Sequence, residues 1–257
     1  MTEPTEPTDP TEHVQARDSV RVCVVVVAYE AAETIQRVLA RLPAHISGAP
    51  FSILVSDDHS SDRTVELGRE WAATAALEVE FLEQPVNLGY GGNQKSAYRW
   101  ALDHGFDVAV LVHGDGQYPP EMSGDVAGPI VAGDADAVFG SRLIIEGGAR
   151  AGHMPLVRLV ANRTLSTYLN FASHADLSEW FSGFRAYRLS SLADIGFEAF
   201  PDGFDFDMAI TLRLLRNGSR VTECAIPTHY GDEISRVPLI RTGLHALAHG
   251  ARGFRRT

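Results

Sequence analysis

The chain has 257 residues and carries 33 acidic against 22 basic side chains, a formal net charge of −11. This balance argues against a nucleic-acid partner, because such proteins need basic surfaces to neutralise phosphates. The longest apolar run, Val22–Ala28, is too short to span a bilayer, and no secretion signal precedes it. We therefore expect a cytoplasmic protein with one substantial core.

The acidic residues 1–19 repeat Thr-Glu-Pro without apolar anchors, which predicts a disordered tail. From Arg21 onward, strand patterns alternate with helix patterns. The predicted strands are Val22–Ala28, Phe51–Val55, Leu77–Leu82, Val108–Val112 and Ala137–Phe139. The predicted helices are Glu33–Leu42, a helix capped by Asp62 and running through Trp71, Gly92–His104, Leu156–Phe171 and Met208–Leu215. Strands separated by helices predict an α/β fold with a mostly parallel sheet.

The strand Val108–Val112 stops at a carboxylate, Asp115, that lies between two glycines. In open α/β sheets, ligands bind beyond the carboxyl ends of the strands. A divalent cation held by one or two carboxylates and by a nucleotide's phosphates would suit Asp115. Gly-Asp-Gly is equally typical of a tight turn, so this motif alone leaves both interpretations open.

Two further loops follow predicted strands. Asp57 and Asp58 end the second strand, where a carboxylate can bind a ribose or a base edge, although polar residues there also cap helices. The loop Asn87–Lys95 contains glycines that permit close backbone approach, and it opens a helix whose N-terminus favours anions. Taken alone, this loop also fits a flexible connection.

Several short motifs follow one another along the chain, each occurring once. They are Asp57-Asp58-x-Ser60-x-Asp62-x-Thr64, Asn87-x-Gly89-x-Gly91, Asp115-Gly116-Gln117-x-Pro119-Pro120-Glu121, Gly140-Ser141-Arg142, Ser182-Gly183-Phe184-Arg185 and Glu223-x-x-Ile226-Pro227. Together they resemble the family 2 glycosyltransferases of the GT-A fold, and most closely the polyprenyl-phosphate (dolichol-phosphate mannose synthase-like) branch. The resemblance implies one Rossmann-like GT-A domain over residues 20–235, with helices flanking a mostly parallel central sheet.

The resemblance also implies roles for individual residues. Asp115, with Gln117, would hold Mg²⁺ or Mn²⁺ against the donor diphosphate. The residues implied to contact the nucleotide-sugar are Ala28, Tyr29, Glu30, Asp57, Asp58, Asn87, Gly89, Gly91, Lys95 and Gly114. Arg142 would face phosphate; Arg163 and Arg236 fall near further phosphate-binding positions, and each fits a solvated surface arginine equally well.

One departure affects the metal motif. Where the family usually has Asp-x-Asp, this chain reads His113-Gly114-Asp115, so one carboxylate is missing. Mg²⁺ tolerates this loss because it relies on few protein carboxylates together with phosphates and water. We expect His113 to pack or to form a hydrogen bond at the strand's end rather than to bind the metal.

The sequence leaves two kinds of sugar acceptor open, a lipid phosphate and a hydroxyl group. A lipid phosphate is already largely anionic near neutrality, because its second pKa is about 6, and it needs arginines. A hydroxyl acceptor on a glycan or small metabolite needs a carboxylate base, for which Asp205 and Asp207 are candidates. Asp207 precedes an apolar run and is predicted to cap a helix, which leaves Asp205 as the candidate base.

Residues 236–257 predict a basic amphipathic helix. Such a helix can lie on an anionic membrane, which suits a lipid acceptor at the inner face of the cell membrane, or it can dock on the core or on a second subunit. The sequence thus predicts an inverting, metal-dependent enzyme that transfers sugar from a UDP- or GDP-linked donor to a polyprenyl-phosphate-type lipid. The alternatives are a hydroxyl acceptor and a non-catalytic relative that only binds nucleotide-sugar.

Overall fold

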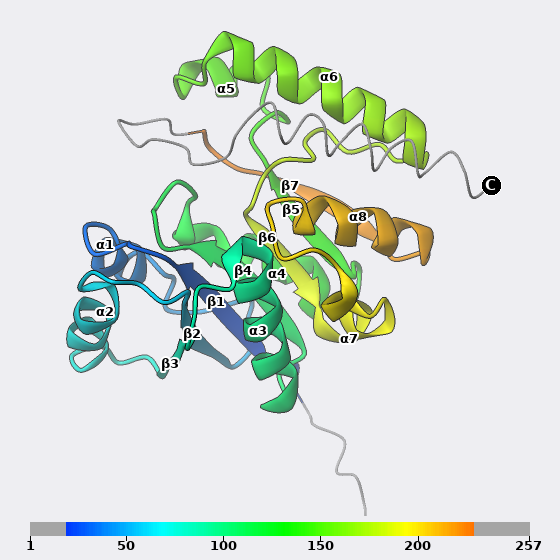
Figure 1. Ribbon diagram of the computed structural model, residues 1–257. Coiled ribbons are helices and arrows are strands. Elements are labelled where there is room, and N and C mark those ends of the chain that lie inside the picture. The colour runs from blue at the N-terminus through cyan, green and yellow to red at the C-terminus, as the bar shows by residue number, and fades with distance from the viewer. Residues whose placement is uncertain (1–18, 229–257) are drawn as a thin grey trace, which may run out of the picture.

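The computed structural model describes residues 19–228 (Figure 1). All but the last residue of the predicted acidic tail, and all of the predicted helix 236–257 with Arg236, lie outside the described residues. The strands are β1 (Val22–Ala28), β2 (Phe51–Asp57), β3 (Val79–Glu83), β4 (Val108–His113), β5 (Ala137–Ser141), β6 (Arg185–Arg188) and β7 (Val221–Ala225). The α-helices are α1 (Ile35–Ala40), α2 (Thr64–Ala72), α3 (Gly89–Asp103), α4 (Ser123–Val131), α5 (Gly148–Ala151), α6 (Leu156–Ser173), α7 (Leu189–Asp194) and α8 (Phe206–Arg216), with short 3-10 turns at Pro120–Met122 and Phe197–Ala199.

The strands form one seven-stranded sheet in the order β3-β2-β1-β4-β6-β5-β7. β6 pairs antiparallel with both of its neighbours, and the other pairings are parallel. The predicted α/β class with a mostly parallel sheet is therefore confirmed. Because the chain passes from β1 to β2 and β3 on one side and then to β4 on the other, the sheet has a topological switch point between β1 and β4.

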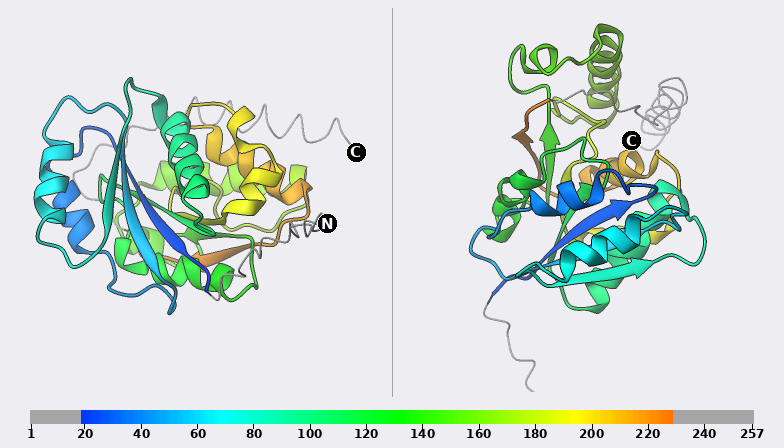
Figure 2. Two further views of the ribbon diagram at one scale, coloured as in Figure 1. Left: turned by 90° about the horizontal axis from the view of Figure 1, so that it is seen from below. Right: turned by 90° about the vertical axis from the view of Figure 1, so that its left-hand side faces the viewer.

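Both faces of the sheet are buried, which explains the continuous apolar runs in β1 and β4. Alternate residues of β1 point to opposite faces: Val24 packs with the α1 and α4 side, whereas Val25 packs with α3, α7 and α8. The two layers of helices on either side of the sheet are visible in Figure 2. This double cover leaves the strand ends as the places where polar side chains reach solvent.

The structure adds elements that the sequence pattern did not predict. β6 has only four residues and includes the buried Arg185, and β7 is half-buried at a sheet edge, so neither shows a long apolar run. α4 contains Pro129, which is uncommon inside a helix. α2 begins at Thr64, later than predicted, although Asp62 still accepts a hydrogen bond from the Thr64 amide at 3.0 Å.

α5 and α6 stand at one end of the molecule, apart from the helices that cover the sheet (Figures 1 and 2). α6 is an 18-residue helix and contacts α8 rather than a strand. Across residues 19–228, none of the helices combines the length and the hydrophobicity that crossing a bilayer requires.

Asp136 ties together three strands at the edge of the sheet. Its carboxylate accepts hydrogen bonds from the Arg220 amide at 2.8 Å, from the Arg220 guanidinium at 2.8 Å and from Arg188 Nε at 3.3 Å. These donors, Arg220 first, hold the pKa of Asp136 well below its ordinary value.

We expect Asp136→Asn to lower the free energy of unfolding at pH 7 by about 2 kcal/mol, because the hydrogen bonds lose their charge. A depressed carboxyl pKa stabilises the fold above the unfolded-state pKa and loses that contribution as pH falls toward the native value. Urea unfolding measured from pH 7 down to pH 3 should therefore show the two proteins converging in stability. A constant difference across this range would contradict the assignment.

Candidate active site

The predicted site residues gather where β1, β2 and β4 end together. Ala28 lies opposite Asp57 in the pairing of β1 with β2, and Val27 lies opposite His113 in the pairing of β1 with β4. Gly114 then donates its amide to the Val27 carbonyl at 2.9 Å. A Cβ on Gly114 would lie 3.2 Å from the Ala28 Cβ, so a glycine suits this close approach. The switch point therefore carries the predicted nucleotide residues of three strands.

The two aspartates that end β2 and begin its loop are buried and already have partners. Asp57 accepts from the Ser60 amide at 2.8 Å and from the Ser60 hydroxyl at 2.5 Å. Asp58 accepts from the amides of Leu88 at 2.7 Å and Gly89 at 3.0 Å. Burial raises the pKa of Asp58 despite these amides. Both aspartates thus shape the loops, and their contact with a nucleotide stays a prediction.

Residues after β1 turn outward toward solvent. Tyr29 is 43% exposed, and its contact with a nucleotide stays a prediction. Glu30 adopts a left-handed backbone, with φ 49°, and its amide donates to the Ser60 hydroxyl at 2.8 Å. Asn87 is also exposed, and its side-chain amide donates to the Asp58 carbonyl at 3.1 Å. An aromatic ring and an amide thus border the switch point.

The glycine-rich start of α3 forms hydrogen bonds with a backbone carbonyl of the segment that precedes α8. The amides of Gly91 and Gly92 donate to the Asp202 carbonyl at 2.7 and 3.2 Å. A Cβ on Gly91 would lie 2.6 Å from the Phe206 Cβ, which excludes larger residues. Lys95 donates to the Phe200 carbonyl at 2.7 Å. Gly91 and Lys95 therefore hold the segment that precedes α8, and their predicted contact with nucleotide stays a prediction.

Asp115 lies exposed just beyond β4. Its Oδ1 accepts from the Gln117 amide at 3.1 Å across a turn in which Gly116 has φ +76°. Within residues 19–228, no group of three or more histidine, cysteine or carboxylate side chains is close enough together to hold a metal. Asp115 therefore fits a cation only if phosphates or water complete its coordination, which is the habit of Mg²⁺.

His113 packs and forms a hydrogen bond, as expected from the sequence. Its Nε2 lies 3.2 Å from the Tyr90 hydroxyl, and its ring meets Tyr118 edge to face at 5.1 Å. Tyr118 in turn lies under the Arg142 guanidinium, 5.6 Å from ring centre to Cζ. These contacts bring Arg142, at the end of β5, to the side of the site that carries the Asp115 turn.

Arg142 is paired with a carboxylate that sequence reasoning missed. Glu179 is fully buried and forms a salt bridge with the Arg142 side chain, while its Oε2 accepts the Arg142 amide at 2.8 Å. Glu179 also accepts from Asn162 of α6 at 2.8 Å. No local pattern in the sequence links these residues, because they come from three separate segments. Contact of Arg142 with phosphate stays a prediction.

The two acidic residues at the start of α8 have different positions. Asp205 occupies the N-cap without a side-chain capping bond and is half-exposed. Asp207 lies two residues further on, in the first turn of the helix, is buried, and accepts from the Tyr90 hydroxyl at 2.7 Å. The prediction that Asp207 caps this helix is therefore wrong, because its side chain turns inward to a phenol.

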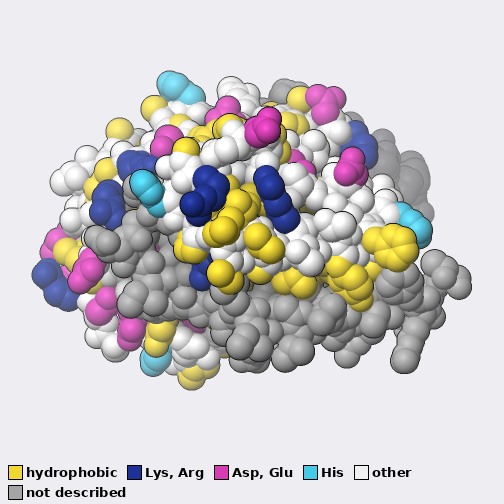
Figure 3. Space-filling view, turned by 90° about the horizontal axis from the view of Figure 1, so that it is seen from above, with side chains coloured by type: hydrophobic (Ala, Val, Ile, Leu, Met, Phe, Trp, Pro, Cys, Tyr) yellow, Lys and Arg dark blue, Asp and Glu magenta, His cyan; other side chains and the backbone are white. Residues whose placement is uncertain are grey.

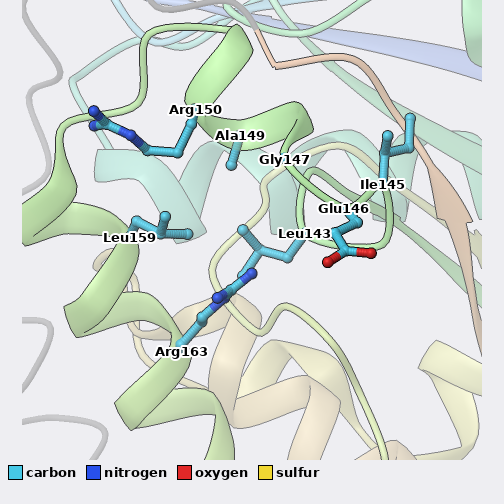
Figure 4. A pocket seen from close by; sticks show the side chains of 8 residues that line it. All are labelled: Leu143, Ile145, Glu146, Gly147, Ala149, Arg150, Leu159 and Arg163. Carbon is cyan, nitrogen blue, oxygen red and sulfur yellow. The ribbon is translucent and has the colours of Figure 1, made fainter.

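A cavity of about 310 Å³ lies between α6 and the segment that follows β5. Figure 4 shows Arg163 reaching from α6 toward the loop that carries Leu143 and Glu146. Leu159 and Ile145 add apolar walls, so the cavity combines two arginines and one carboxylate, Glu146, with hydrocarbon. Arg163 thus lines this cavity, and its contact with phosphate stays a prediction.

Comparison with known proteins places this geometry in a family. The glycosyl transferase family 2 model matches residues 23–196. The chain is 30% identical over 211 residues to the polyprenol monophosphomannose synthase of Mycolicibacterium smegmatis, covering 82% of this chain and 78% of that protein. It is also 30% identical over 210 residues to the undecaprenyl-phosphate mannosyltransferase of Micrococcus luteus, covering 80% of this chain and 82% of that protein.

Solved structures show the same fold at lower identity. Glucosyl-3-phosphoglycerate synthase from Mycobacterium tuberculosis superposes with a TM-score of 0.63 at 17% identity, covering 90% of this chain and 80% of that one. The same enzyme in complex with Mn²⁺, UDP and glucosyl-3-phosphoglycerate gives a TM-score of 0.58 at 17% identity, covering 89% and 76%. The fold is thus that of GT-A glycosyltransferases, and the chain belongs to glycosyl transferase family 2.

Proposed function

We propose that this glycosyltransferase is an inverting, metal-dependent enzyme that moves a sugar from a UDP- or GDP-linked donor to a polyprenyl-phosphate-type lipid. The observation that carries the proposal is the exposed Asp115 at the switch point, beside the ends of β1 and β2. Two relatives at 30% identity, named for polyprenol and undecaprenyl-phosphate mannosyl transfer, support the lipid acceptor.

The donor half of the proposal rests on the residues around that carboxylate. Tyr29 offers an exposed ring for the base, and the Asp115 carboxylate, with Gln117, would hold Mg²⁺ or Mn²⁺ against the diphosphate. Of the structural neighbour's complexes with UDP, one contains Mn²⁺ and glucosyl-3-phosphoglycerate and another contains Mg²⁺, which supports this arrangement. When bound, such a cation neutralises charge that develops on the departing diphosphate. Asp115 supplies its one protein carboxylate.

The acceptor half rests on the cavity beside α6. A phosphate monoester needs no base, since its second pKa of about 6 leaves it largely anionic, but it needs cations and a path for its hydrocarbon. Arg150 and Arg163 supply two positive charges against the single negative charge of Glu146, and Leu159 is part of the apolar wall. Asp205, the candidate base for a hydroxyl acceptor, lies on α8 and does not line this cavity. These positions favour the lipid phosphate.

The outer face of α6 suits contact with a membrane. Its exposed apolar side chains include Leu156, Val157, Val160 and Phe171. α6 contains no acidic residue, and its two charged side chains are Arg158 and Arg163, although the whole chain has a charge of −11. Figure 3 shows apolar side chains gathered between basic ones on this end of the molecule. We place peripheral contact with the anionic inner membrane face here.

Asp115→Asn should abolish transfer, with a loss of about 10²–10³-fold, because the diphosphate loses its cation. Binding of UDP and GDP titrated with and without Mn²⁺ should also lose its metal dependence in this variant. Asp125→Asn, which removes an exposed carboxylate from α4, is the matched control. Retention of metal-dependent binding in Asp115→Asn would reject the assignment.

Arg163→Gln should raise the KM for polyprenyl phosphate about tenfold and leave the KM for the donor unchanged, because one charge-assisted contact to phosphate is lost. Asp205→Asn should change kcat less than twofold. Steady-state kinetics with a short-chain polyprenyl phosphate measure both. A collapse of kcat in Asp205→Asn, with a normal KM in Arg163→Gln, would favour a hydroxyl acceptor.

Val157→Glu should weaken binding to anionic vesicles at least about tenfold, since the substitution removes apolar burial and adds repulsion. Val157 is 75% exposed, so the fold should tolerate the change. Val86→Glu, at a residue 57% exposed in the β3–α3 connection, makes the same chemical change elsewhere. Equal vesicle sedimentation of the two variants would remove α6 from the membrane contact.

A further inference from the structure

Three side chains from different elements form a buried connection beneath the switch point. Tyr90 of α3 donates its hydroxyl proton to Asp207 Oδ2 of α8 at 2.7 Å. The same hydroxyl oxygen lies 3.2 Å from Nε2 of His113, the last residue of β4. His113 stands where the family usually has the first carboxylate of its metal motif, so this connection bears on the site itself.

The direction of these hydrogen bonds follows from the number of protons available. A phenol has one proton to donate, and a carboxylate can only accept. Because Tyr90 gives its proton to Asp207, its oxygen is left to accept, and the donor facing it must be Nε2–H of His113. Desolvation, reinforced by the charge of Asp207, raises the pKa of Tyr90 well above its ordinary value, so the phenol keeps its proton.

The negative charge of Asp207 has two supports in the structure. Arg185 is completely buried, and its guanidinium donates to the Asp207 backbone carbonyl at 3.2 Å and to Thr211 Oγ1 at 2.7 Å. A buried guanidinium keeps its charge and requires an anion nearby. Although burial alone would lower it, the pKa of Arg185 is held above its ordinary value by Tyr187 and Asp207. Asp207 also lies in the first turn of α8, where the helix dipole favours an anion.

We infer that Tyr90 and Asp207 are positioning residues that hold the His113 imidazole as its Nε2–H tautomer and leave Nδ1 as a hydrogen-bond acceptor, two residues before Asp115. The ring is also fixed by shape. A Cβ on Gly183 would lie 2.6 Å from His113 Cε1 and 2.7 Å from Nε2, so only a glycine leaves room for the ring beside the segment that precedes β6. Tyr118 closes another side edge to face.

The same hydrogen bonds distinguish Asp207 from Asp205, the other candidate base. Asp207 Oδ2 is occupied by the Tyr90 proton, and Oδ1 is buried without a hydrogen-bond partner among the described residues. Asp207 is therefore turned into the fold and is not positioned to act as a base for an incoming acceptor. The functional part of the inference, that His113 Nδ1 accepts a hydrogen bond when the nucleotide-sugar is bound, rests on the proposed function, whereas the tautomer itself does not.

The tautomer of His113 can be read directly by nuclear magnetic resonance of the full chain labelled with ¹⁵N at its ten histidines. Long-range ¹H–¹⁵N spectra distinguish a protonated from an unprotonated ring nitrogen. His113 is assigned as the ring whose signals vanish in His113→Gln. In the wild type at pH 8 we expect a protonated Nε2 and an unprotonated Nδ1. A wild-type ring protonated on Nδ1 would overturn the inference without any variant.

Tyr90→Phe should remove the acceptor and let both nitrogens of His113 shift toward averaged values. Tyr118→Phe is the matched control, because it deletes a hydroxyl beside the same ring, one that accepts from the Gly183 amide and has no bond to Asp207. We expect this control to keep the Nε2–H pattern. An unchanged tautomer in Tyr90→Phe, or equal averaging in both variants, would contradict the proposed role of Tyr90.

Catalysis gives an independent readout. With metal at saturation and each substrate varied while the other is saturating, Tyr90→Phe should raise the KM for the nucleotide-sugar about tenfold more than it changes the KM for the lipid phosphate. If the wild type transfers no sugar but His113 has the expected tautomer, the proposed function fails and the positioning inference stands. If transfer occurs but the tautomer is reversed, the positioning inference fails alone.

Discussion

The amide of Gly114 bonds to the carbonyl of Val27 and so fixes where β4 ends relative to β1. The candidate site depends on this alignment. Because the two strands are parallel neighbours at the switch point, their carboxyl ends open on the same edge, next to Asp57 of β2. The bond requires close backbone approach, and the glycine at position 114 permits it. Asp115 then follows as the first side chain beyond the joined strand ends.

Polar groups around this edge mostly serve the fold. Asp58 holds the start of α3 through two backbone amides, and the Asp202 carbonyl occupies the amides that a helix start would otherwise offer to phosphate. Buried polar groups need such partners, because an unpaired one costs about 1–3 kcal/mol. What remains exposed is a small set, including Tyr29 and Asp115, and this set is what a nucleotide would meet.

Much of the fold could be predicted from the sequence. The apolar runs of β1, β2 and β4 are buried on both faces, so their pattern is unambiguous, and the strand-helix alternation indicated a parallel sheet. β6 could not be predicted, because it is four residues long and includes Arg185, whose charge is typical of a surface. The buried Arg185 guanidinium donates hydrogen bonds to the carbonyls of Ser182 and Trp180 and interacts electrostatically with Asp207. These interactions exist only in the folded chain.

The site was predicted in its location more than in its contacts. A strand that ends in Gly-Asp-Gly indicates a ligand edge, and Asp115 lies there. The partners of Arg142, Lys95 and Asp207 come from distant segments, so no local spacing reveals them. Arg163 illustrates the same limit: its position on α6 was predictable, but its place at a cavity depends on how the 143–150 segment folds back.

The central claim is transfer of sugar to a lipid phosphate, and one measurement tests it most directly. The purified chain is incubated with membrane lipid extract, Mn²⁺ and, in turn, each labelled UDP- and GDP-sugar, and label is counted in the organic-soluble fraction. We expect one donor to label that fraction and a chelator to abolish the label. Label confined to the aqueous phase with every donor, or transfer that persists unchanged in the chelator, would contradict the account.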